Sequence, residues 1–433
     1  MGRVSASVAR ALYAAAWSLV LPAAVARLWW RGRAEPGYRE RLPERLGWYR
    51  RPPSAGWIWV HAVSLGETRA AAALIDALRL ALPGARLLLT HGTATGQAAG
   101  AALLREGDCQ AWLPFDTPGA VNRFLRQFRP RLGVLMETEV WPALLHAAQQ
   151  RAVPMVLANA RLSERSRARG RRWDSLLRGP VGSLALVLAQ TDEDAQRIRD
   201  SGAAHVRVCG NLKYDLTPDA QQLALGASWR ALVARPVVLA AITREGEEGA
   251  LLQAWRRRSC AAALLLIVPR HPQRFDEVAG LVRDAGFSLA RRSQWDQVPD
   301  EQALAKDVWL GDSMRELALY YATARVALLG GSFAPLGGHN LIEAAACGCP
   351  LVMGPSIFNF QEAAMLSLAA GASRQVEDFD AAIAAVDAWL AAPGQLAQAA
   401  QAALQFAAAH RGAAQRMAHA IVTLLDVPGG AAG

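Results

Sequence analysis

From residue 57 onward, short hydrophobic runs alternate with longer segments in which hydrophobic residues recur every three or four positions. The short runs predict buried strands at residues 57–62, 86–90, 132–136, 154–158, 184–189, 237–241, 263–268, 308–310, 325–329 and 350–353. Strands that alternate with helices form βαβ units, and these units build parallel sheets. The pattern therefore predicts an α/β fold of two doubly wound, Rossmann-like domains that face a cleft.

Polar residues interrupt this alternation between residues 210 and 218, where Thr217-Pro218 is typical of a linker. We therefore place an N-terminal Rossmann-like domain at residues 34–215 and a C-terminal one at residues 216–425. The C-terminal domain includes an Ala- and Gln-rich helical tail that starts near residue 381. Residues 1–33 precede both domains as a separate segment.

An uncharged run of 16 residues, from 11 to 26, dominates this first segment. As a helix the run is about 24 Å long, which is shorter than the roughly 30 Å of a bilayer's hydrocarbon core. Extension to Trp30 reaches that length, with Arg27 able to snorkel and the tryptophans suited to the interface. We expect one membrane anchor, with its arginine-rich flank and the main body in the cytoplasm; whether it spans the membrane or lies in it stays open.

Two alternatives fit the same segment. Arg3 and Arg10 precede the apolar run and Ala24-Val25-Ala26 resembles a cleavage site, as in a secretory signal peptide. A buried core helix is the other alternative, but Pro22 and the one-sided arginine flank disfavour it. The basic and aromatic residues that continue after the run favour the anchor.

The formal net charge of +10 is concentrated in two arginine-rich blocks. Residues 1–51 hold ten arginines and three glutamates, a charge of +7, and residues 161–172 hold six arginines and one glutamate, a charge of +5. Subtracting both blocks leaves −2 for the rest of the chain. Nucleic-acid binding over a broad groove is therefore disfavoured, while a membrane surface and small anions remain as partners.

Cysteine and histidine usage argues against disulfides and metal sites. Five cysteines are an odd number, and we expect a reducing compartment without disulfides. The eight histidines offer no H-x-x-x-H pair, and Cys347-Gly348-Cys349 is too tight for the usual zinc-ligand spacing. No metal site built from protein ligands is predicted.

Ligands of doubly wound sheets bind beyond the carboxyl ends of the strands. In the first domain, Glu67 follows one predicted strand, and Glu137 and Glu139 follow another. Ser64-x-x-Glu67 is also a capping box, which is a purely structural explanation. If the site is functional, the helix N-terminus keeps Glu67 ionised as a base, and the second acid orients an acceptor.

In the second domain, Arg270 is mounted between two prolines at a strand end, where a guanidinium can meet a phosphate. Glycine-rich turns, Gly330-Gly331 and Gly337-Gly338, lead to a predicted helix near Asn340 whose N–H groups could bind an anion, with Glu343 for ribose hydroxyls. Neither G-x-G-x-x-G nor a Walker A sequence occurs. Together the two domains predict a nucleotide-sugar glycosyltransferase.

Several motifs closely resemble the bacterial lipid A Kdo (3-deoxy-D-manno-octulosonic acid) transferases. They lie at residues 38–47, 61–68, 136–142, 158–163, 210–215, 268–272, 337–340 and 354–360. The resemblance implies a GT-B fold that moves Kdo from CMP-Kdo to a lipid A precursor at the anionic inner membrane. It implies an acceptor-binding N-terminal domain, a CMP-sugar-binding C-terminal domain, and no metal or cofactor.

Residue roles carry over by position. The resemblance assigns Glu67 as the general base of an inverting transfer, and Glu137 and Lys213 to transition-state stabilisation. It assigns the CMP site to Pro269, Arg270, Met314, Arg315, Glu316, Asn340, Leu341, Ile342 and Glu343. The family often has Met-Gly-Glu in place of Met314-Arg315-Glu316 and Asn-Pro-Leu-Glu in place of residues 340–343, so the nucleotide geometry at Arg315 is left open.

With a phosphorylated lipid as acceptor, we expect the second basic block to contact the membrane or the acceptor phosphates; the alternative is a solvated helix. Two other functions remain open. The chain could transfer a different CMP- or UDP-linked sugar, or it could be a membrane-attached binding protein for lipid A or nucleotide without turnover. Intact Glu67, Glu137 and Lys213 argue against the second.

Overall fold

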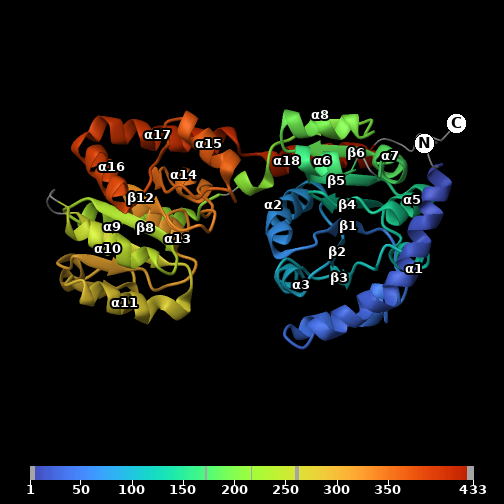
Figure 1. Cartoon of the computed structure of the whole chain (residues 1–433), viewed down its shortest axis with the longest axis horizontal. Coiled ribbons are helices and arrows are strands. Elements are labelled where there is room, and N and C mark those ends of the chain that lie inside the picture. The colour runs from blue at the N-terminus through green and yellow to red at the C-terminus, as the bar shows by residue number, and fades with distance from the viewer. Residues whose placement is uncertain (1–4, 171–172, 216, 259–262, 427–433) are drawn as a thin grey trace. The chain divides into compact units, whose positions relative to one another are not determined.

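The structure is a computed structural model that describes residues 5–170, 173–215, 217–258 and 263–426 (Figure 1). The chain divides into two compact units. The N-terminal unit contains Met1–Asp215 and Gly412–Gly433, and the C-terminal unit contains Leu216–Arg411. The chain first passes from the N-terminal to the C-terminal unit between residues 215 and 216, within the polar segment 210–218.

The N-terminal unit is built on a parallel sheet of seven strands in the order β3-β2-β1-β4-β5-β6-β7. The strands are β1 Ile58–His61, β2 Leu87–His91, β3 Cys109–Trp112, β4 Leu132–Met136, β5 Met155–Ala160, β6 Leu186–Ala189 and β7 Val206–Val208. Ile58 of β1 is paired with Leu87 of β2 on one side and with Leu132 of β4 on the other. The strand order reverses between β1 and β4, which makes their carboxyl ends the switch point of the sheet.

Helices cover both faces of this sheet. They are α2 Leu65–Ala81, α3 Ala94–Ala101, α4 Pro118–Phe128, α5 Pro142–Gln150, α6 Glu164–Gly170, α7 Asp174–Gly182, α8 Asp192–Asp200 and α18 Ala413–Asp426. Side chains of β1 alternate between the faces, as the period of a strand requires. Ile58 and Val60 join one core cluster with α2, and Trp59 joins the other with Phe124 and Phe128 of α4.

Several helices begin where a hydroxyl side chain caps them. Ser64 accepts a hydrogen bond from the Glu67 N–H at the start of α2, and Thr93, Thr117 and Thr191 cap α3, α4 and α8 in the same way. Each cap satisfies an N–H that the helix leaves unpaired. The turns after the strands are thereby fixed, and these turns carry the candidate site.

Helix α18 returns to the N-terminal unit, which differs from the expected C-terminal tail. The Asp215 carboxylate accepts hydrogen bonds from the N–H groups of Gly412 and Ala414. Met417 and Ile421 are fully buried in the core that also contains α2. The Ala- and Gln-rich pattern does predict a helix here, but such a pattern cannot tell which of two similar sheets receives its apolar face.

The C-terminal unit has a second parallel sheet, in the order β10-β11-β9-β8-β12-β13-β14. Its strands are β8 Val237–Thr243, β9 Leu264–Pro269, β10 Leu289–Arg291, β11 Val308–Leu310, β12 Val326–Leu329, β13 Leu351–Met353 and β14 Ser373–Gln375. Its helices are α9 Ala220–Leu232, α10 Glu247–Arg256, α11 Phe275–Asp284, α12 Glu301–Leu304, α13 Leu317–Thr323, α14 Ile342–Ala346, α15 Gln361–Ala369, α16 Phe379–Ala391 and α17 Pro393–Ala409. The predicted α/β class with two doubly wound sheets is confirmed.

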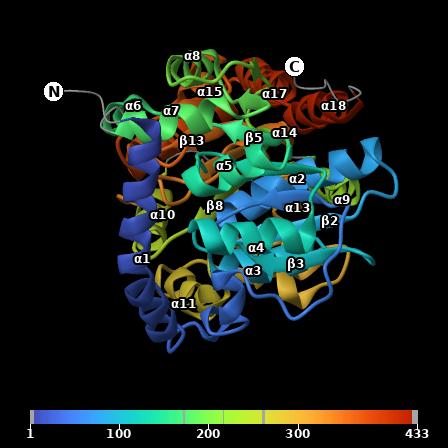
Figure 2. The same cartoon turned by 90° about the vertical axis from the view of Figure 1, so that its right-hand side faces the viewer.

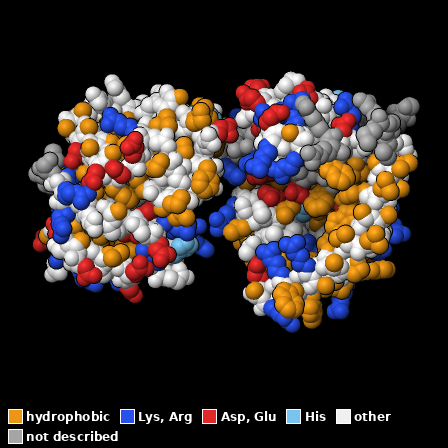
Figure 3. All heavy atoms as spheres, in the orientation of Figure 1, with side chains coloured by type: hydrophobic (Ala, Val, Ile, Leu, Met, Phe, Trp, Pro, Cys, Tyr) orange, Lys and Arg blue, Asp and Glu red, His pale blue; other side chains and the backbone are white. Residues whose placement is uncertain are grey.

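A long apolar helix, α1 Ala6–Arg31, belongs to the N-terminal unit and contacts α5 and α7 (Figures 1 and 2). Among the described residues it is the one helix that is long and apolar enough to cross a membrane. The space-filling view shows hydrophobic side chains along its outer side (Figure 3).

The described cysteines, Cys109, Cys209, Cys347 and Cys349, are free thiols, and Cys260 lies outside the described residues.

Candidate active site

The switch point of the N-terminal sheet gathers three of the residues predicted to act in catalysis. Glu67 lies in the first turn of α2, just after β1, and Glu137 directly follows the neighbouring strand β4. Lys213 reaches the same place from the segment after β7, with its Nζ 3.6 Å from Glu137 Oε1. Residues 67, 137 and 213 are far apart in the sequence and adjacent in the fold.

Glu67 is held by two hydrogen bonds. Its Oε2 accepts from the Val63 N–H at 2.7 Å, and its Oε1 accepts from the Ser64 hydroxyl at 3.0 Å. Burial raises the pKa of Glu67; the two hydrogen bonds and Lys213 oppose this shift, and the charge of Glu137 reinforces it. The place of Glu67 at a helix N-terminus predicts a carboxylate that stays ionised, but burial has the stronger influence on its pKa. A raised pKa makes the carboxylate a stronger base.

Glu137 adopts a left-handed backbone conformation, with φ of 58°. Such a conformation costs a non-glycine residue about 1–3 kcal/mol and persists where the surrounding structure enforces it. The Glu137 N–H donates to the Ala158 carbonyl at 2.9 Å, and the Arg161 N–H donates to the Glu137 carbonyl at 3.4 Å. Both bonds tie the turn to β5 and its end, so the position of this carboxylate is fixed by the sheet.

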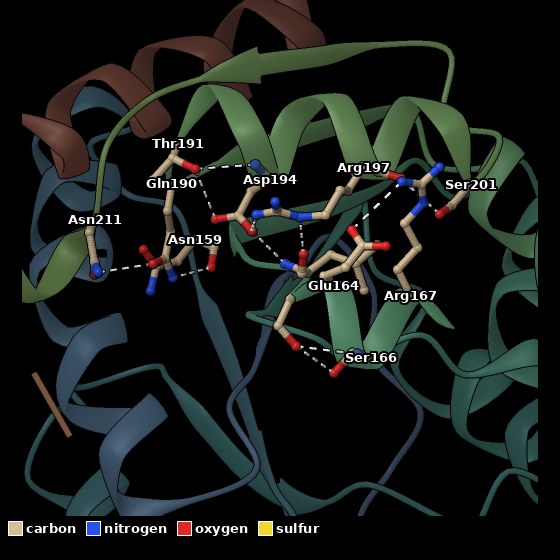
Figure 4. A network of polar contacts seen from close by, with 12 residues as sticks. Asn159, Glu164, Ser166, Arg167, Gln190, Thr191, Asp194, Arg197, Ser201 and Asn211 are labelled. Carbon is tan, nitrogen blue, oxygen red and sulfur yellow. Dashed lines mark hydrogen bonds and ion pairs between the residues drawn. The ribbon is translucent and has the colours of Figure 1, made fainter. Parts of the chain in front are cut away.

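Lys213 lies on the 3₁₀ helix Leu212–Tyr214, which a polar network holds in place (Figure 4). Asn159 Oδ1 accepts from the first N–H of this helix at 3.0 Å, and Asn211 Oδ1 accepts from the Lys213 N–H at 3.0 Å. Gln190 joins the two asparagines: it donates to the Asn159 carbonyl at 2.8 Å and accepts from the Asn211 side chain at 2.9 Å. The backbone of Lys213 is therefore positioned independently of its ammonium group.

Glu139 is a third carboxylate of this cluster, and sequence reasoning gave it no role of its own. Burial raises the pKa of Glu139 to about 7, with the charges of Glu67 and Glu137 adding to the shift. Within the described residues these side chains do not form a group that could hold a metal ion. The cluster thus concentrates carboxylates beside a single lysine, and the pKa of Glu139 places the protonation change of this one side chain near neutral pH.

The raised pKa of Glu139 predicts a pH-dependent cost in stability. A carboxyl whose pKa is higher in the folded chain than its usual value of about 4.3 favours folding while protonated, and this contribution is lost as the pH rises through about 7. Glu139→Gln should therefore unfold at a higher temperature than the wild type at pH 8, with little difference at pH 5. Thermal unfolding at both pH values measures this.

The control is Glu106→Gln, because Glu106 is exposed and lies outside the cluster. This variant should follow the wild type at both pH values. If Glu139→Gln gains no stability at pH 8 relative to pH 5, the raised pKa of Glu139 is contradicted.

A cavity of about 500 Å³ opens beside Glu137. Its lining combines apolar side chains, among them Leu157 and Val181, with Arg161 and Arg167 of the second basic block. Arg178, Asp174 and Asp200 also line the cavity, which therefore combines apolar surface with charges of both signs next to the carboxylate cluster.

The arginines of the second basic block differ in their surroundings; Figure 4 labels one of them, Arg167. Arg167 is half-buried and pairs with Asp200 at 2.9 Å, so its charge is compensated. Arg161, Arg165 and Arg169 are exposed. The remaining members, at positions 171 and 172, lie outside the described residues. Exposed guanidinium groups thus remain on and just before α6.

The residues predicted for the CMP site follow carboxyl ends of strands in the C-terminal unit. Pro269 closes β9 and Arg270 comes next, residues 314–316 follow β11, and residues 340–343 follow β12. In the order β11-β9-β8-β12, β9 is adjacent to β11 and is separated from β12 by one strand. Because the strands are parallel, the structure brings all three segments to one edge of the sheet.

The backbone at Arg315 has the conformation expected of the glycine that the family often has at this position. It adopts φ of 66°, in the left-handed region that glycine occupies without cost. Its carbonyl accepts from the Gln222 side chain at 2.8 Å, while its own side chain is exposed and lines a cavity of about 260 Å³ together with Glu343. The turn that suits a family glycine is therefore retained here with an arginine. The neighbouring Glu316 is fixed by Arg292 at 2.8 Å.

Residues 340–343 divide between core and surface. Leu341 and Ile342 are buried, whereas Asn340 and Glu343 are half-buried. Asn340 Oδ1 accepts from the Ile342 N–H at 3.1 Å, and helix α14 has only five residues. The helix predicted to receive an anion is thus short, and its first N–H is already paired with the Asn340 side chain.

Sequence reasoning missed Arg244, which follows β8 at the switch point of this sheet. Burial lowers the pKa of His339 to about 4, and the charges of Arg270 and Arg244 add to the shift. A Cβ at Gly331 would come within 3.1 Å of His339 Nε2 and 3.7 Å of Arg244 Cγ, so glycine leaves room between them. Two guanidinium groups and an imidazole gather here. The position of Arg244 after a central strand could have revealed it.

Comparison with known proteins agrees with this geometry. The family model for 3-deoxy-D-manno-octulosonic-acid transferase (kdotransferase) matches residues 40–216. The chain is 45% identical to the 3-deoxy-D-manno-octulosonic acid transferase of Bordetella pertussis over 91% of this chain and 94% of that protein. It is 36% identical to the enzyme of the same name from Haemophilus influenzae, over 88% and 91% of the two chains.

Among solved structures, the UDP-GlcNAc 2-epimerase of Neisseria meningitidis has a TM-score of 0.51 at 14% identity. The similarity covers 85% of this chain and 99% of the epimerase, and at this identity it shows the fold alone. The two sheets and this neighbour identify the GT-B architecture. The identity to the Bordetella and Haemophilus enzymes over nearly their whole length shows that the chain belongs to the Kdo transferases, a family of glycosyltransferases.

Proposed function

We propose that this chain transfers Kdo from CMP-Kdo to a lipid A precursor with inversion of configuration, and that Glu67 is the general base. One observation carries the proposal: Glu67, Glu137 and Lys213 converge at the switch point of the N-terminal sheet, where doubly wound folds bind ligands. If Glu67 only capped helix α2, neither Glu137 nor Lys213 would need to lie beside it.

The acceptor half of the reaction follows from the carboxylate cluster. Glu67 takes the proton of the acceptor hydroxyl as its oxygen attacks the anomeric carbon of Kdo. Its raised pKa suits this step, and Val63 and Ser64 hold the carboxylate in one orientation. Lys213, paired with Glu137, supplies a positive charge for the negative charge that develops in the transition state.

The donor half follows from the basic cluster of the C-terminal unit. The bond between Kdo and the phosphate of CMP breaks, and CMP leaves with the bonding electrons. Arg270 is exposed at the end of β9, and Arg244 lies near it. Both guanidinium groups can bind the departing phosphate, a role for which planar, permanently charged side chains are suited. Asn340 and Glu343, half-buried at the same edge, are proposed to contact the nucleoside.

The proposed acceptor is a lipid, so the proposed location is the cytoplasmic face of the inner membrane, with α1 as the attachment. The exposed arginines at positions 161, 165 and 169 and the cavity beside Glu137 would face the lipid's phosphates and its apolar part. Each basic residue near an anionic surface contributes about 1 kcal/mol of attraction.

The direct test incubates the purified full chain with CMP-Kdo and a lipid A precursor and identifies the product by mass spectrometry. We expect a mass gain of one or more Kdo residues, stoichiometric release of CMP, and an unchanged rate in EDTA. A panel of other CMP- and UDP-sugars should give no product. Transfer of another sugar in place of Kdo, or nucleotide binding without turnover, contradicts the proposal.

A further inference from the structure

Helix α1 lies against the N-terminal unit over its middle part, from about Ala9 to Leu28. Its half-buried positions recur every three or four residues, which places them on one face of the helix. They include Arg10, Tyr13, Trp17, Leu21, Ala24 and Leu28. We call this the inner face of α1. Contacts with α5 and α7 agree with this docking, and Figure 2 shows α1 running beside the unit.

Two specific contacts fix the first half of the inner face. The Tyr13 hydroxyl donates to Asp116 Oδ2 at 2.9 Å. Asp116 is 2% exposed and also accepts from the N–H groups of Ala143 and Leu144, at 3.0 and 2.8 Å, at the start of α5. The Trp17 ring lies 5.6 Å from that of Phe115 between centroids. The helix is therefore joined to the folded body by a buried carboxylate that has other structural partners.

The opposite face of α1 is exposed and apolar. Its positions also follow helical spacing, and none of them carries a charge: Val8, Leu12, Leu19, Ala23, Ala26 and Trp30. We call this the outer face of α1; it appears as a stripe of hydrophobic side chains in Figure 3. From Val8 to Trp30 it is about 33 Å long at the rise of an α-helix. Leu19 is 83% exposed.

Arginine and tryptophan are paired at the end of this stripe. Arg33 lies over the Trp30 ring at 4.2 Å, and Arg39 lies over the Trp29 ring at 4.4 Å. Tryptophan prefers the membrane–water interface, and arginine is attracted to anionic headgroups. The charge and the aromatic rings thus specify a lipid surface as the partner of the outer face.

We propose that α1 lies in the plane of the membrane, within one leaflet, and does not cross the bilayer. The inner face stays docked on the N-terminal unit while the outer face enters the boundary between headgroups and acyl chains, as in interfacial helices. A spanning helix would carry Tyr13 and Trp17 into the hydrocarbon and separate them from Asp116 and Phe115. The two arrangements exclude each other. The inference rests on the membrane attachment proposed above and specifies its form.

Cross-linking tests the docking in native membranes. Ala14 and Ala147 line one cavity of about 250 Å³ between α1 and α5. In the full chain, Ala14→Cys with Ala147→Cys should be joined within the chain by a short bis-maleimide that can span this cavity. The matched control, Leu12→Cys with Ala147→Cys, should not, because Leu12 is on the outer face. Absence of the first cross-link in membranes overturns the proposal.

Sidedness distinguishes an in-plane helix from a spanning one. Ser7→Cys near the start of α1 should react with a membrane-impermeant maleimide in inverted inner-membrane vesicles and stay unreacted in intact spheroplasts, relative to the wild-type chain. Labelling from the spheroplast side, or loss of the residue through cleavage, overturns the proposal.

Vesicle binding tests the outer face itself. Leu19 and Leu80 are 83% and 82% exposed, on α1 and α2. Leu19→Glu should weaken binding to phosphatidylethanolamine–phosphatidylglycerol vesicles about tenfold or more, since it removes an inserted leucine and adds charge. Leu80→Glu should bind like the wild type. Equal vesicle binding by the two variants overturns the proposal. So does a Leu19→Glu variant that still binds vesicles but no longer dimerises, because the outer face would then contact a second copy of the chain. Kdo transfer by Leu19→Glu, measured in detergent micelles, tests the proposed enzyme activity separately from membrane binding.

Discussion

Glu67→Gln should lower the rate of Kdo transfer by about 10²–10⁴-fold, the usual contribution of a general base. The amide keeps the size of the side chain and can still accept the Val63 N–H, but it cannot take a proton from the acceptor hydroxyl. CMP binding should persist, because the basic cluster around Arg270 belongs to the C-terminal unit. A kcat measurement with isothermal titration of CMP checks both halves.

The capping role of Glu67 requires a separate control. Loss of an N-cap interaction costs about 0.5–2 kcal/mol of stability, so a rate loss must be separated from partial unfolding. Thr117→Ala removes an equivalent cap from α4, away from the carboxylate cluster. It should lower the unfolding temperature without a matching loss of transfer. Near-normal turnover in Glu67→Gln, or parallel losses in the two variants, would leave Glu67 as a capping residue only.

Lys213→Ala should lower kcat by about 10²–10³-fold, the typical effect of removing one transition-state donor. The KM for CMP-Kdo should change far less, because the charge is needed mainly when the phosphate departs. Stability should be nearly unchanged: Asn159 and Asn211 hold the backbone of this segment, and a partly exposed ion pair contributes only about 0–1 kcal/mol. Lys213→Arg keeps the charge but not the compact shape, so it should be intermediate.

A double-mutant cycle with Glu137→Gln tests whether the pair acts as a unit. The Glu137–Lys213 separation of 3.6 Å is short enough for strong coupling. The double variant should be about as slow as the slower single variant. If the losses in kcat of the two single variants multiply in the double variant, the two side chains act independently. If Lys213→Ala keeps the wild-type kcat, Lys213 has no role in the mechanism.

Edge strands mark the limit of what hydrophobic runs predict about the fold. All ten predicted strands occupy interior positions of the two sheets. The four unpredicted ones, β3, β7, β10 and β14, are the four edges. Interior strands are covered on both faces and need continuous apolar runs. Edge strands such as Val206–Val208 and Ser373–Gln375 are short and partly exposed, so their sequences resemble loops.

The candidate site shows a similar division. Glu67 and Glu137 could be placed together in advance, because parallel strands end at a common edge. Lys213 was assigned by motif alone, and the network of Asn159, Gln190 and Asn211 that positions it depends on side-chain contacts that spacing does not encode. Arg244 has no motif around it; its one sequence signal is its place just after the predicted strand at 237–241, and the strand order shows that this strand is central.

The return of α18 to the first sheet has a consequence for biosynthesis. Met417 and Ile421 complete the core of the N-terminal unit, yet the ribosome makes them after the 196 residues Leu216–Arg411. At about 5–20 residues per second, the interval is roughly 10–40 s. During that time the C-terminal unit is being synthesised, while the first-made half still lacks the helix that packs against α2. The part of the enzyme translated first is therefore the last to finish folding.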